Sequence, residues 1–395
     1  MVGVEDAASL ILQPSQWEVD GPGEVILLVL VGRQHLDELC TVGDELLELV
    51  PSNFLRHGNL LSLLLVWTRG SRMRHQGSAE AASCMASGQG DRIGQNGPMK
   101  LSPAAAEWRT AGFLLEVQGH NVFATDQGAA TEHPPVLVLH GFPGSSYDWR
   151  AVLPAVAHHT RVVAFDQLGY GLSDKPVDAR YSLFDYADLA ESVARQLGID
   201  DCLLVAHDVG DTVAAELLAR VNEGRSRIGV VHTVLTNGSI FIDMAQLSAG
   251  QLALLSMPDE VLSEPMPLGA LTPGLRATFA PQHLPEQEVL TAMEDLIRCQ
   301  DGDRLLPRLI RYIEERRRNQ PRWTAGLVDH GRPLTALWGE LDPIAVPAMV
   351  DRLRMLRPST TVVTWPDVGH WPSLEVPDRV ADAIVQALSR CPADG

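Results

Sequence analysis

The chain has 395 residues, of which 45% are apolar and 21% charged, as in an ordinary soluble globular protein. These proportions exclude a collagen-like chain, a wholly disordered chain and a small disulfide framework. Lysine and arginine number 31 against 50 acidic residues, a formal charge of -19, so we expect neither nucleic acid nor an anionic membrane surface as a partner.

Five cysteines are scattered along the chain and form no C-x-x-C pair. An odd number without short spacings argues against both a disulfide scaffold and a thiolate zinc site. We therefore expect free thiols in a reducing compartment and a cytoplasmic protein. The cysteines are Cys40, Cys84, Cys202, Cys299 and Cys391.

Residues 1–98 differ in character from the rest. Their start, M-V-G-V-E-D, lacks the basic segment of a secretory signal. The apolar runs Val25–Val31 and Leu60–Trp67 are too short to span a bilayer, and residues 70–97 have the composition of a linker. Two interpretations stay open for residues 1–98, a small accessory domain or an extension without a defined fold, and we favour the extension. A protein that starts at Met99 is then expected to keep full activity.

A hairpin and two buried strands are predicted next. Gly112–Gly119 and His120–Asp126 alternate like the two strands of a β-hairpin. Val136–Leu139 is a short apolar run that ends in H-G-F-P-G, and Arg161–Phe165 is a second run, which ends at Asp166.

Helical spacing and short apolar runs alternate from there to the end of the chain. The spacing predicts helices over Leu183–Leu197, Thr212–Val221 and Pro347–Leu356, and a last helix containing Val380, Ile384 and Leu388. The runs predict strands at Cys202–Ala206, Val230–Leu235, Leu334–Trp338 and Thr361–Thr364. This alternation is typical of an α/β protein, with parallel strands joined by right-handed crossovers.

Residues 241–330 interrupt that alternation between two predicted strands. They contain helical stretches and prolines at positions 258, 265, 267, 273, 281 and 285. We interpret them as an inserted, mostly helical lid. The core is then formed by residues 99–240 and 331–395.

The segment V-A-H-D-V-G-D follows the predicted strand that starts at Cys202 and places Asp208 on the turn into a helix. Ala206 and Gly210 lie two residues to either side, as in the nucleophile elbow, where a strained turn requires small neighbours. The chain contains no G-x-S-x-G. An acidic residue at a helix start is also a common cap, so this segment alone leaves both interpretations open.

Two further residues follow predicted strands at the edge where parallel sheets gather ligands. Asp342 comes after the Leu334 run, in W-G-E-L-D-P, and His370 comes after the Thr361 run, in W-P-D-V-G-H-W. Taken singly, Asp342 could be an ordinary loop or cap residue and His370 an ordinary surface histidine. Together with Asp208 they have the chain order nucleophile, acid, histidine, so we predict a catalytic triad.

These motifs resemble those of a known superfamily. Residues from about 99 to 395 resemble the α/β-hydrolase superfamily in its aspartate-nucleophile branch, the epoxide hydrolases and haloalkane dehalogenases. The resemblance rests on H-G-F-P-G at 140–144, similar to the H-G-x-P of epoxide hydrolases, and on D-Q-L-G-Y-G-L-S-D-K-P at 166–176. It implies a mostly parallel eight-stranded sheet with helices on both faces. More narrowly, segments 207–211, 236–241, 311–318 and 322–327 resemble the mesoderm-specific transcript homologue family.

The residue types then predict a two-step hydrolysis. Asp208 attacks carbon and forms an alkyl ester; His370 takes a proton from the water that attacks the ester, and Asp342 orients and stabilises the imidazole. The backbone N–H groups of Phe142 and Val209 are the expected oxyanion donors. We expect a small apolar epoxide or a related electrophile as the substrate.

The leaving group separates the alternatives. The alkoxide that forms when an epoxide opens needs a proton donor, and Tyr312 is the one tyrosine within the inserted segment. The resemblance to epoxide hydrolases implies two lid tyrosines, so this chain departs from their pattern. Tyr312 is therefore the candidate acid, although it could simply pack in the lid. Dehalogenases hold halide with side-chain N–H groups at the places where this chain has Val209 and Phe142, so dehalogenase activity is disfavoured, with Trp323 as the remaining candidate donor.

The remaining expectations concern groups without an assigned catalytic role. We interpret E-E-R-R-R-N at 314–319 as the solvated face of a lid helix rather than an anion site, and Asp211 as an exposed acid at a helix start rather than a catalytic group. His140 is interpreted as a brace of the oxyanion loop. No P-loop or G-x-G-x-x-G occurs, so we expect no nucleotide cofactor, and no metal site is indicated. A non-catalytic ligand-binding protein of the same fold stays the alternative from another class. The sequence does not indicate the oligomeric state.

Overall fold

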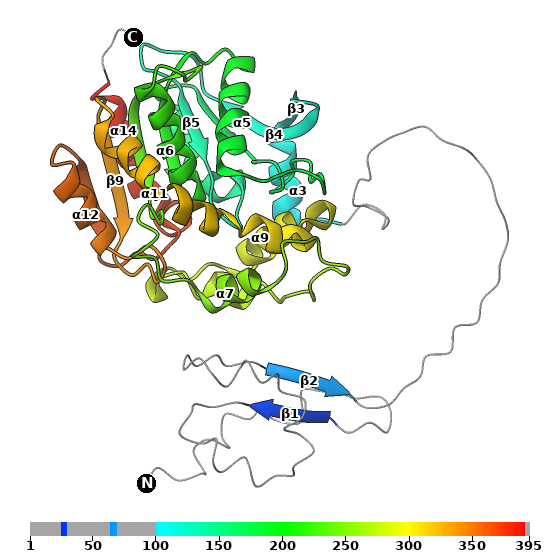
Figure 1. The fold of residues 1–395 in the computed structure, drawn as a ribbon. Coiled ribbons are helices and arrows are strands. Elements are labelled where there is room, and N and C mark those ends of the chain that lie inside the picture. Colours follow the sequence, from blue (N-terminus) through cyan, green and yellow to red (C-terminus); the bar gives the residue numbers. More distant parts are fainter. Residues whose placement is uncertain (1–24, 30–63, 69–99, 392–395) are drawn as a thin grey trace. The chain divides into compact units, whose positions relative to one another are not determined.

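A computed structural model describes residues 25–29, 64–68 and 100–391 (Figure 1). The chain divides into two units, and the first contains the antiparallel pair β1 (Val25–Val29) and β2 (Leu64–Thr68). The prediction that residues 1–98 lack a defined fold otherwise lies outside the described residues. The second unit contains every predicted site residue.

Within residues 100–391, eight strands form one sheet in the order β10-β9-β8-β7-β5-β6-β4-β3. The strands β5 to β10 are parallel to one another, whereas β3 and β4 form an antiparallel hairpin whose β4 pairs antiparallel with β6. This confirms the mostly parallel eight-stranded sheet and the hairpin. The strands are β3 (Phe113–Val117), β4 (His120–Gln127), β5 (Val136–Leu139), β6 (Val162–Phe165), β7 (Asp201–His207), β8 (Gly229–Thr236), β9 (Leu334–Gly339) and β10 (Thr361–Trp365).

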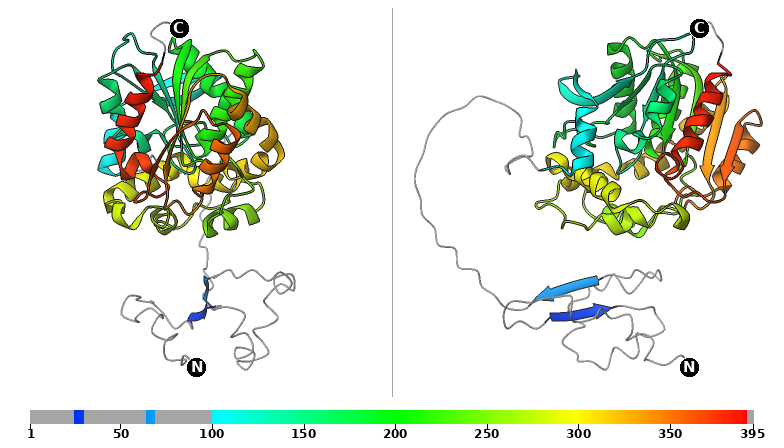
Figure 2. Two further views of the ribbon diagram at one scale, coloured as in Figure 1. Left: turned by 90° about the vertical axis from the view of Figure 1, so that its left-hand side faces the viewer. Right: turned by 180° about the vertical axis from the view of Figure 1, so that it is seen from behind.

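The central strands are buried along almost their whole length because helices cover both faces of the sheet. All four residues of β5 and all six of β9 are buried. The helices α4 (Leu153–Ala157) and α14 (Pro377–Leu388) contact one face, and α5 (Leu183–Gln196) and α6 (Val209–Asn222) contact the other (Figure 2, left). Together with α12 (Ala348–Leu356), these helices confirm the predicted alternation.

The segment between β8 and β9 is mostly helical, as predicted, and lies across one end of the sheet (Figure 1). This end carries the carboxyl termini of the parallel strands, since Thr278 of the segment accepts a hydrogen bond from the backbone of His370. The role of the segment as a lid stays a prediction. Its helices are α7 (Ala249–Ser256), α8 (Thr272–Arg276), α9 (Gln287–Arg298), α10 (Leu306–Leu309) and α11 (Tyr312–Asp329).

The helix at the start of the second unit's described residues has no counterpart in the sequence analysis. Helix α3 (Pro103–Thr110) buries Ala105 and Trp108 and contacts α9. The backbone N–H of Ser102, just before the helix, donates to the Asp295 carboxylate at 2.7 Å. Eight residues contain only two helical turns, too few for a clear apolar period.

Among the described residues, no helix is both long and apolar enough to cross a membrane.

Candidate active site

Asp208 lies on the sharp turn between β7 and α6. Its φ of +49° and ψ of -105° are rare for a residue with a side chain. A Cβ atom at Gly210 would lie 2.6 Å from the carbonyl oxygen of Leu139, so only glycine fits there. This is the strained geometry with small neighbours that the sequence predicts.

The loop after β5 provides a donor to this carboxylate. The backbone N–H of Phe142 donates to Oδ2 of Asp208 at 2.9 Å, and both residues are buried. A Cβ atom at Gly141 would lie 2.6 Å from Cβ of Asp208, which explains the glycine. The other predicted donor, the backbone N–H of Val209, makes no hydrogen bond to the carboxylate in the described part of the chain.

His140 lies beneath this loop. Its Nε2 accepts the backbone N–H of Gln167 at 2.9 Å, so its Nδ1–H donates to the carbonyl oxygen of Gly141, also at 2.9 Å. Burial lowers the pKa of His140, which favours the neutral tautomer that these two bonds require. His140 therefore contacts the oxyanion loop in the way expected of a brace.

Asp342 and His370 form a hydrogen-bonded pair at the ends of β9 and β10. Nδ1 of His370 lies 2.8 Å from Oδ2 of Asp342, and both side chains are buried. The backbone N–H groups of Ile344 and Ala345 donate to the other oxygen, Oδ1, at 2.7 and 3.0 Å. Burial alone would raise the pKa of Asp342, but His370 and these hydrogen bonds lower it overall.

The pKa of His370 shifts in the opposite direction to that of Asp342. Burial alone would lower the pKa of His370, but the Asp342 carboxylate and its hydrogen bond raise it above the usual value. His207, the residue before Asp208, lies beside it: the rings are 5.0 Å apart, and Nε2–H of His207 donates to the carbonyl oxygen of His370 at 2.8 Å. This bond joins the turn of Asp208 to the loop of His370.

Two residues that the sequence analysis did not single out hold this pair in place. Asn237 follows β8 with φ of +44°; its Nδ2 donates to Oδ2 of Asp342 at 2.7 Å, and its Oδ1 accepts the backbone N–H of Gly339 at 2.9 Å. The Glu375 carboxylate accepts three backbone N–H groups, from the residues on either side of His370 and from the inserted segment. These donors are Gly369 at 2.8 Å, Trp371 at 3.0 Å and Ala280 at 3.1 Å.

Arg316 corrects the prediction of a wholly solvated face over residues 314–319. It is buried, and its Nη2 donates to the backbone oxygen of Asp208 at 2.8 Å and lies 3.6 Å from Oδ1 of the same residue. Its Nε donates to Oγ1 of Thr212 at 2.7 Å. Arg317 and Arg318 are exposed, as expected. A run of three arginines does not reveal which one meets a buried carboxylate.

Tyr312, the candidate acid, is buried beside the oxyanion loop. Its ring lies 5.5 Å from that of Phe142, and its hydroxyl oxygen accepts a hydrogen bond from Nε2 of Gln251 at 3.3 Å. Burial and then the nearby Asp208 raise the pKa of Tyr312 well above its usual value. The hydroxyl proton has no acceptor among the described residues, so it is free to donate.

A comparison with known families identifies the fold of this chain. Residues 134–377 match the family model described as alpha/beta hydrolase fold. The chain belongs to the α/β-hydrolase fold family. This finding confirms the resemblance on which the sequence analysis relied.

Individual proteins agree with this assignment. The α/β hydrolase is 38% identical to LipZ of Mycobacterium tuberculosis over 73% of this chain and 99% of LipZ. It is 35% identical to the mesoderm-specific transcript protein of Mus musculus over 71% of this chain and 86% of that protein, and 42% identical to epoxide hydrolase 1 of Caenorhabditis elegans over 26% and 24%. A solved haloalkane dehalogenase of Bradyrhizobium elkani has a TM-score of 0.58 at 22% identity, covering 70% of this chain and 97% of that one.

One further prediction for this α/β hydrolase is wrong, and one alternative that stayed open loses its candidate donor. Asp211 is fully buried instead of exposed, and burial raises its pKa well above the usual value. Its Oδ1 accepts the backbone N–H of Thr236 at 3.4 Å. Trp323 is also buried, and its indole N–H donates to Oε2 of Glu216 at 3.0 Å, so it is not available as a halide donor.

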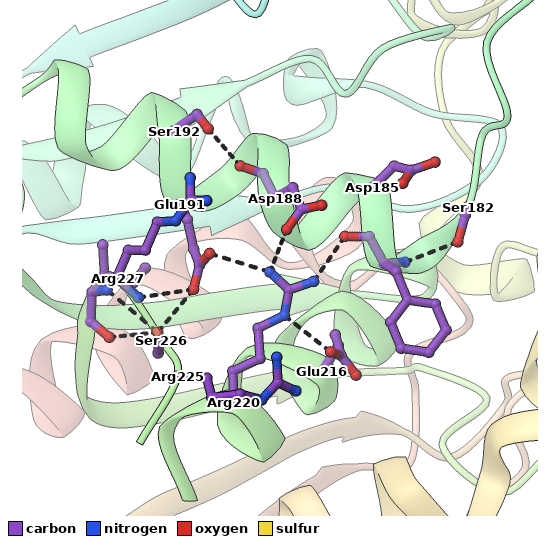
Figure 3. Close-up of polar contacts among 12 residues, drawn as sticks. Ser182, Asp185, Asp188, Glu191, Ser192, Glu216, Arg220, Arg225, Ser226 and Arg227 are labelled. Atoms are coloured by element: carbon purple, nitrogen blue, oxygen red, sulfur yellow. Dashed lines mark hydrogen bonds and ion pairs between the residues drawn. The ribbon is translucent and has the colours of Figure 1, made fainter. Parts of the chain in front are cut away.

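A partly buried ionic network joins the helix that follows Asp208 to its neighbours. Arg220 of α6 donates to Asp188 at 2.6 Å and Glu191 at 3.1 Å, both on α5, and to Glu216 on its own helix at 3.0 Å (Figure 3). Glu216 also accepts Nε of Arg322, on α11, at 2.7 Å. The network thus joins α5, α6 and α11 of this α/β hydrolase.

Proposed function

We propose that this α/β hydrolase uses Asp208 as a nucleophile and forms a covalent alkyl ester with a small apolar epoxide or a related electrophile. The proposal rests chiefly on the hydrogen bond from the Phe142 backbone N–H to Oδ2 of Asp208. A donor fixed on a carboxylate at a strained turn orients one oxygen and leaves the other, Oδ1, to attack carbon.

The second step hydrolyses the ester. Nε2 of His370 takes a proton from water, whose oxygen attacks the Asp208 carbonyl carbon, while Asp342 stabilises the imidazolium that forms. The negative charge develops on Oδ2, the oxygen that the Phe142 N–H contacts. One such donor is worth about 3 kcal/mol of transition-state stabilisation. Val209 is the further proposed donor once charge develops.

The proton for the alkoxide comes, in this proposal, from Tyr312. Its hydroxyl proton has no acceptor among the residues that the structure describes, and its ring lies against Phe142. The phenol keeps its proton until a strong base such as an alkoxide forms, since its pKa is raised. A halide would need a fixed N–H donor instead, and the indole of Trp323 is engaged with Glu216. Epoxide hydrolysis is therefore favoured over dehalogenation.

Trapping the ester tests the proposal. The His370→Gln variant is incubated with a panel of small epoxides, digested and examined by mass spectrometry. We expect a peptide containing Asp208 whose mass increases by that of the epoxide. The Asp208→Asn/His370→Gln double variant is the matched control and gains no mass. Absence of an adduct across the panel would contradict the proposal and favour the non-catalytic ligand-binding alternative.

We further propose that the protein acts on a small molecule in the cytoplasm, without nucleic acid and without a cofactor. The steps above use only side chains and backbone groups of this chain, and the formal charge of -19 disfavours polyanions. Cell fractionation with an antibody against the protein tests the location; recovery in a membrane or secreted fraction would contradict it.

A further inference from the structure

Arg316 lies between the two residues that carry the negative charge in the proposed reaction. Its Nη2 lies 3.6 Å from Oδ1 of Asp208, and its Cζ lies over the ring of Tyr312, 4.7 Å from the ring centre. Tyr312 and Arg316 are four residues apart on α11, so their side chains share one side of the helix. All three side chains are buried. One buried cation thus lies beside both the candidate nucleophile and the candidate acid.

Hydrogen bonds fix the guanidinium of Arg316 in this place. Its Nε donates to Oγ1 of Thr212 at 2.7 Å, and its Nη2 donates to the backbone oxygen of Asp208 at 2.8 Å. Asp208 and Thr212 are four residues apart at the start of α6. Within residues 100–391, Asp208 is the one carboxylate within ion-pair distance of Arg316. The charge of Arg316 is therefore directed at the Asp208 turn and not at a separate ionic network.

The first step of the proposed reaction moves the negative charge from one neighbour of Arg316 to the other. Oδ1 of Asp208 bonds to an epoxide carbon, the ring C–O bond breaks, and its electron pair stays on the substrate oxygen, which takes the proton of Tyr312. Asp208 is then a neutral ester, and Tyr312 is a phenolate whose charge spreads over the ring. Cleavage of the ester by water releases one proton, which neutralises Tyr312 while Asp208 regains its charge. A buried charge without a partner is costly, and Arg316 has a partner at each stage.

Among the described groups that face the Tyr312 hydroxyl, Arg316 is the cation. Burial raises the pKa of Tyr312, and the nearby Asp208 and Tyr170 raise it further. Arg316 and the hydrogen bond from the neutral amide of Gln251 lower this pKa. A cation over an aromatic face is attracted by the π electrons, and the attraction increases when the ring carries a negative charge. Arg316 therefore stabilises the phenolate more than the phenol.

We propose that Arg316 is a positioning residue of the reaction, whose guanidinium balances the charge on Asp208 before the epoxide opens and the charge on Tyr312 afterwards. This role rests on the proposed function, because it belongs to the same reaction. An arginine that only holds the strained turn would use the same hydrogen bond to the backbone oxygen of Asp208. The two roles differ in whether the effect of Arg316 depends on the Tyr312 hydroxyl.

The first measurement is the rate at which the Asp208 adduct forms after mixing with an epoxide, in proteins that all carry His370→Gln. Arg316→Gln should slow adduct formation at least about tenfold, equivalent to about 1.4 kcal/mol. In the Tyr312→Phe background, which forms no phenolate, the same change should alter the rate by less than about threefold. Arg316→Lys keeps the charge and should recover part of the rate. Arg318→Gln, with an exposed arginine of the same helix changed, is the matched control and should leave the rate unchanged.

The second measurement needs no turnover and decides the question even if Tyr312→Phe forms no adduct. Trifluorotyrosine, whose phenol is more acidic than that of tyrosine, replaces Tyr312, and fluorine NMR follows its ionisation in the folded protein. Arg316→Gln should move this ionisation to higher pH, Arg316→Lys should move it less, and Arg318→Gln should leave it unchanged. If Arg316→Gln does not fold, Thr212→Val removes the acceptor of Nε and should move the ionisation in the same direction by a smaller amount.

Two results would overturn the role of Arg316 alone. One is an equal slowing by Arg316→Gln with and without the Tyr312 hydroxyl, which would mean that the arginine only holds the turn. The other is a phenol that ionises at the same pH with and without Arg316, or that does not ionise in the folded protein. Failure of the proposed function gives a different result, because no adduct would then form in any variant while the ionisation of Tyr312 would still respond to Arg316.

Discussion

His207 and His370 lie side by side, yet their pKa values move in opposite directions. Burial lowers the pKa of His207 to about 4, so this ring is neutral and serves as a fixed donor to the backbone of His370. Burial also opposes the charge on His370, but Asp342 outweighs it and raises the pKa. Of the two, His370 is therefore the histidine suited to exchange protons near neutral pH.

For His207, stability should fall in acid. The pKa is about 6.5 in the unfolded chain and about 4 in the folded one, so the unfolded state binds the extra proton between these values. The contribution of His207 to the free energy of unfolding is fully present above pH 6.5. It is lost as the pH falls towards 4, and the total loss is roughly 3 kcal/mol. Urea unfolding of the wild type and of His207→Gln, which can keep the donor, measures this. Equal pH slopes in the two proteins would contradict it.

For His370, the contribution to stability depends on pH in the opposite way. Its folded pKa is raised, so its contribution is complete below pH 6.5 and is lost as the pH rises through the raised value. The difference in unfolding free energy between the wild type and His370→Gln should therefore shrink from pH 6 upward. Ester hydrolysis should quicken over the same range, because the proposed base must be neutral. A stability difference that grows with pH would refute the assignment.

At this scale the triad is predicted because its residues come shortly after strands. Asp208, Asp342 and His370 do so, and parallel strands bring their carboxyl ends to one edge. Glu375 and Arg316 act through contacts with residues distant in the chain, and no spacing rule brings those partners together. A charged residue is predicted to be exposed unless its partner is known, which is why the burial of Arg316 was missed.

The packing of α11 on α6 requires a glycine. A Cβ atom at Gly326 would lie 2.4 Å from the carbonyl oxygen of Ala215, a backbone atom that cannot move freely. Gly326→Ala should therefore destabilise the protein even though alanine favours helix by about 1 kcal/mol. Gly274→Ala in α8 is the matched control, since nothing lies within 4 Å of its added Cβ. Thermal melting should separate the two; a stabilised Gly326→Ala would show that the helices do not pack this closely.

The ion pairs of Arg220 should contribute more to the free energy of unfolding than the ion pairs on the surface. Arg220→Met leaves Glu191, only 2% exposed, without its guanidinium partner. Loss of one partner of a buried pair costs about 3–5 kcal/mol. The exposed pair of Arg225 and Glu223 gives a control, in which Arg225→Met should cost less than about 1 kcal/mol. Denaturant unfolding at pH 7 checks both, and similar losses would contradict the ranking.

Element boundaries follow from the sequence less well than element types. The sequence predicts that helix α6 starts at Thr212, whereas it starts at Val209, directly after the strained turn at Asp208. The actual start places Asp208 directly at the helix N-terminus. Helix α3 was missed, since its packing against α9 rather than an apolar period maintains it.

Over the whole molecule, the alternation of strands and helices predicts parallel strands, and the predicted strands, with both strands of the hairpin, number eight, as the family resemblance also implies. The strand order, in which β5 lies between β6 and β7, depends on long crossovers that no local pattern encodes. The negative charge is a property of the hydrolase unit. Residues 99–395 contain 38 acidic and 25 basic residues, which gives 25 - 38 = -13 of the total -19.

The division of the chain into two units predicts how truncation acts. A protein of residues 99–395 retains α3 and the bond from Ser102 to Asp295, so its melting temperature and epoxide adduct should match those of the full chain. A protein of residues 112–395 lacks α3 and exposes the surface that Ala105 and Trp108 cover, so it should melt several degrees lower. Calorimetry and the trapping experiment on the three proteins measure both effects. If removal of residues 1–98 lowered the melting temperature as much as the further loss of α3, the hydrolase unit would depend on its leading segment.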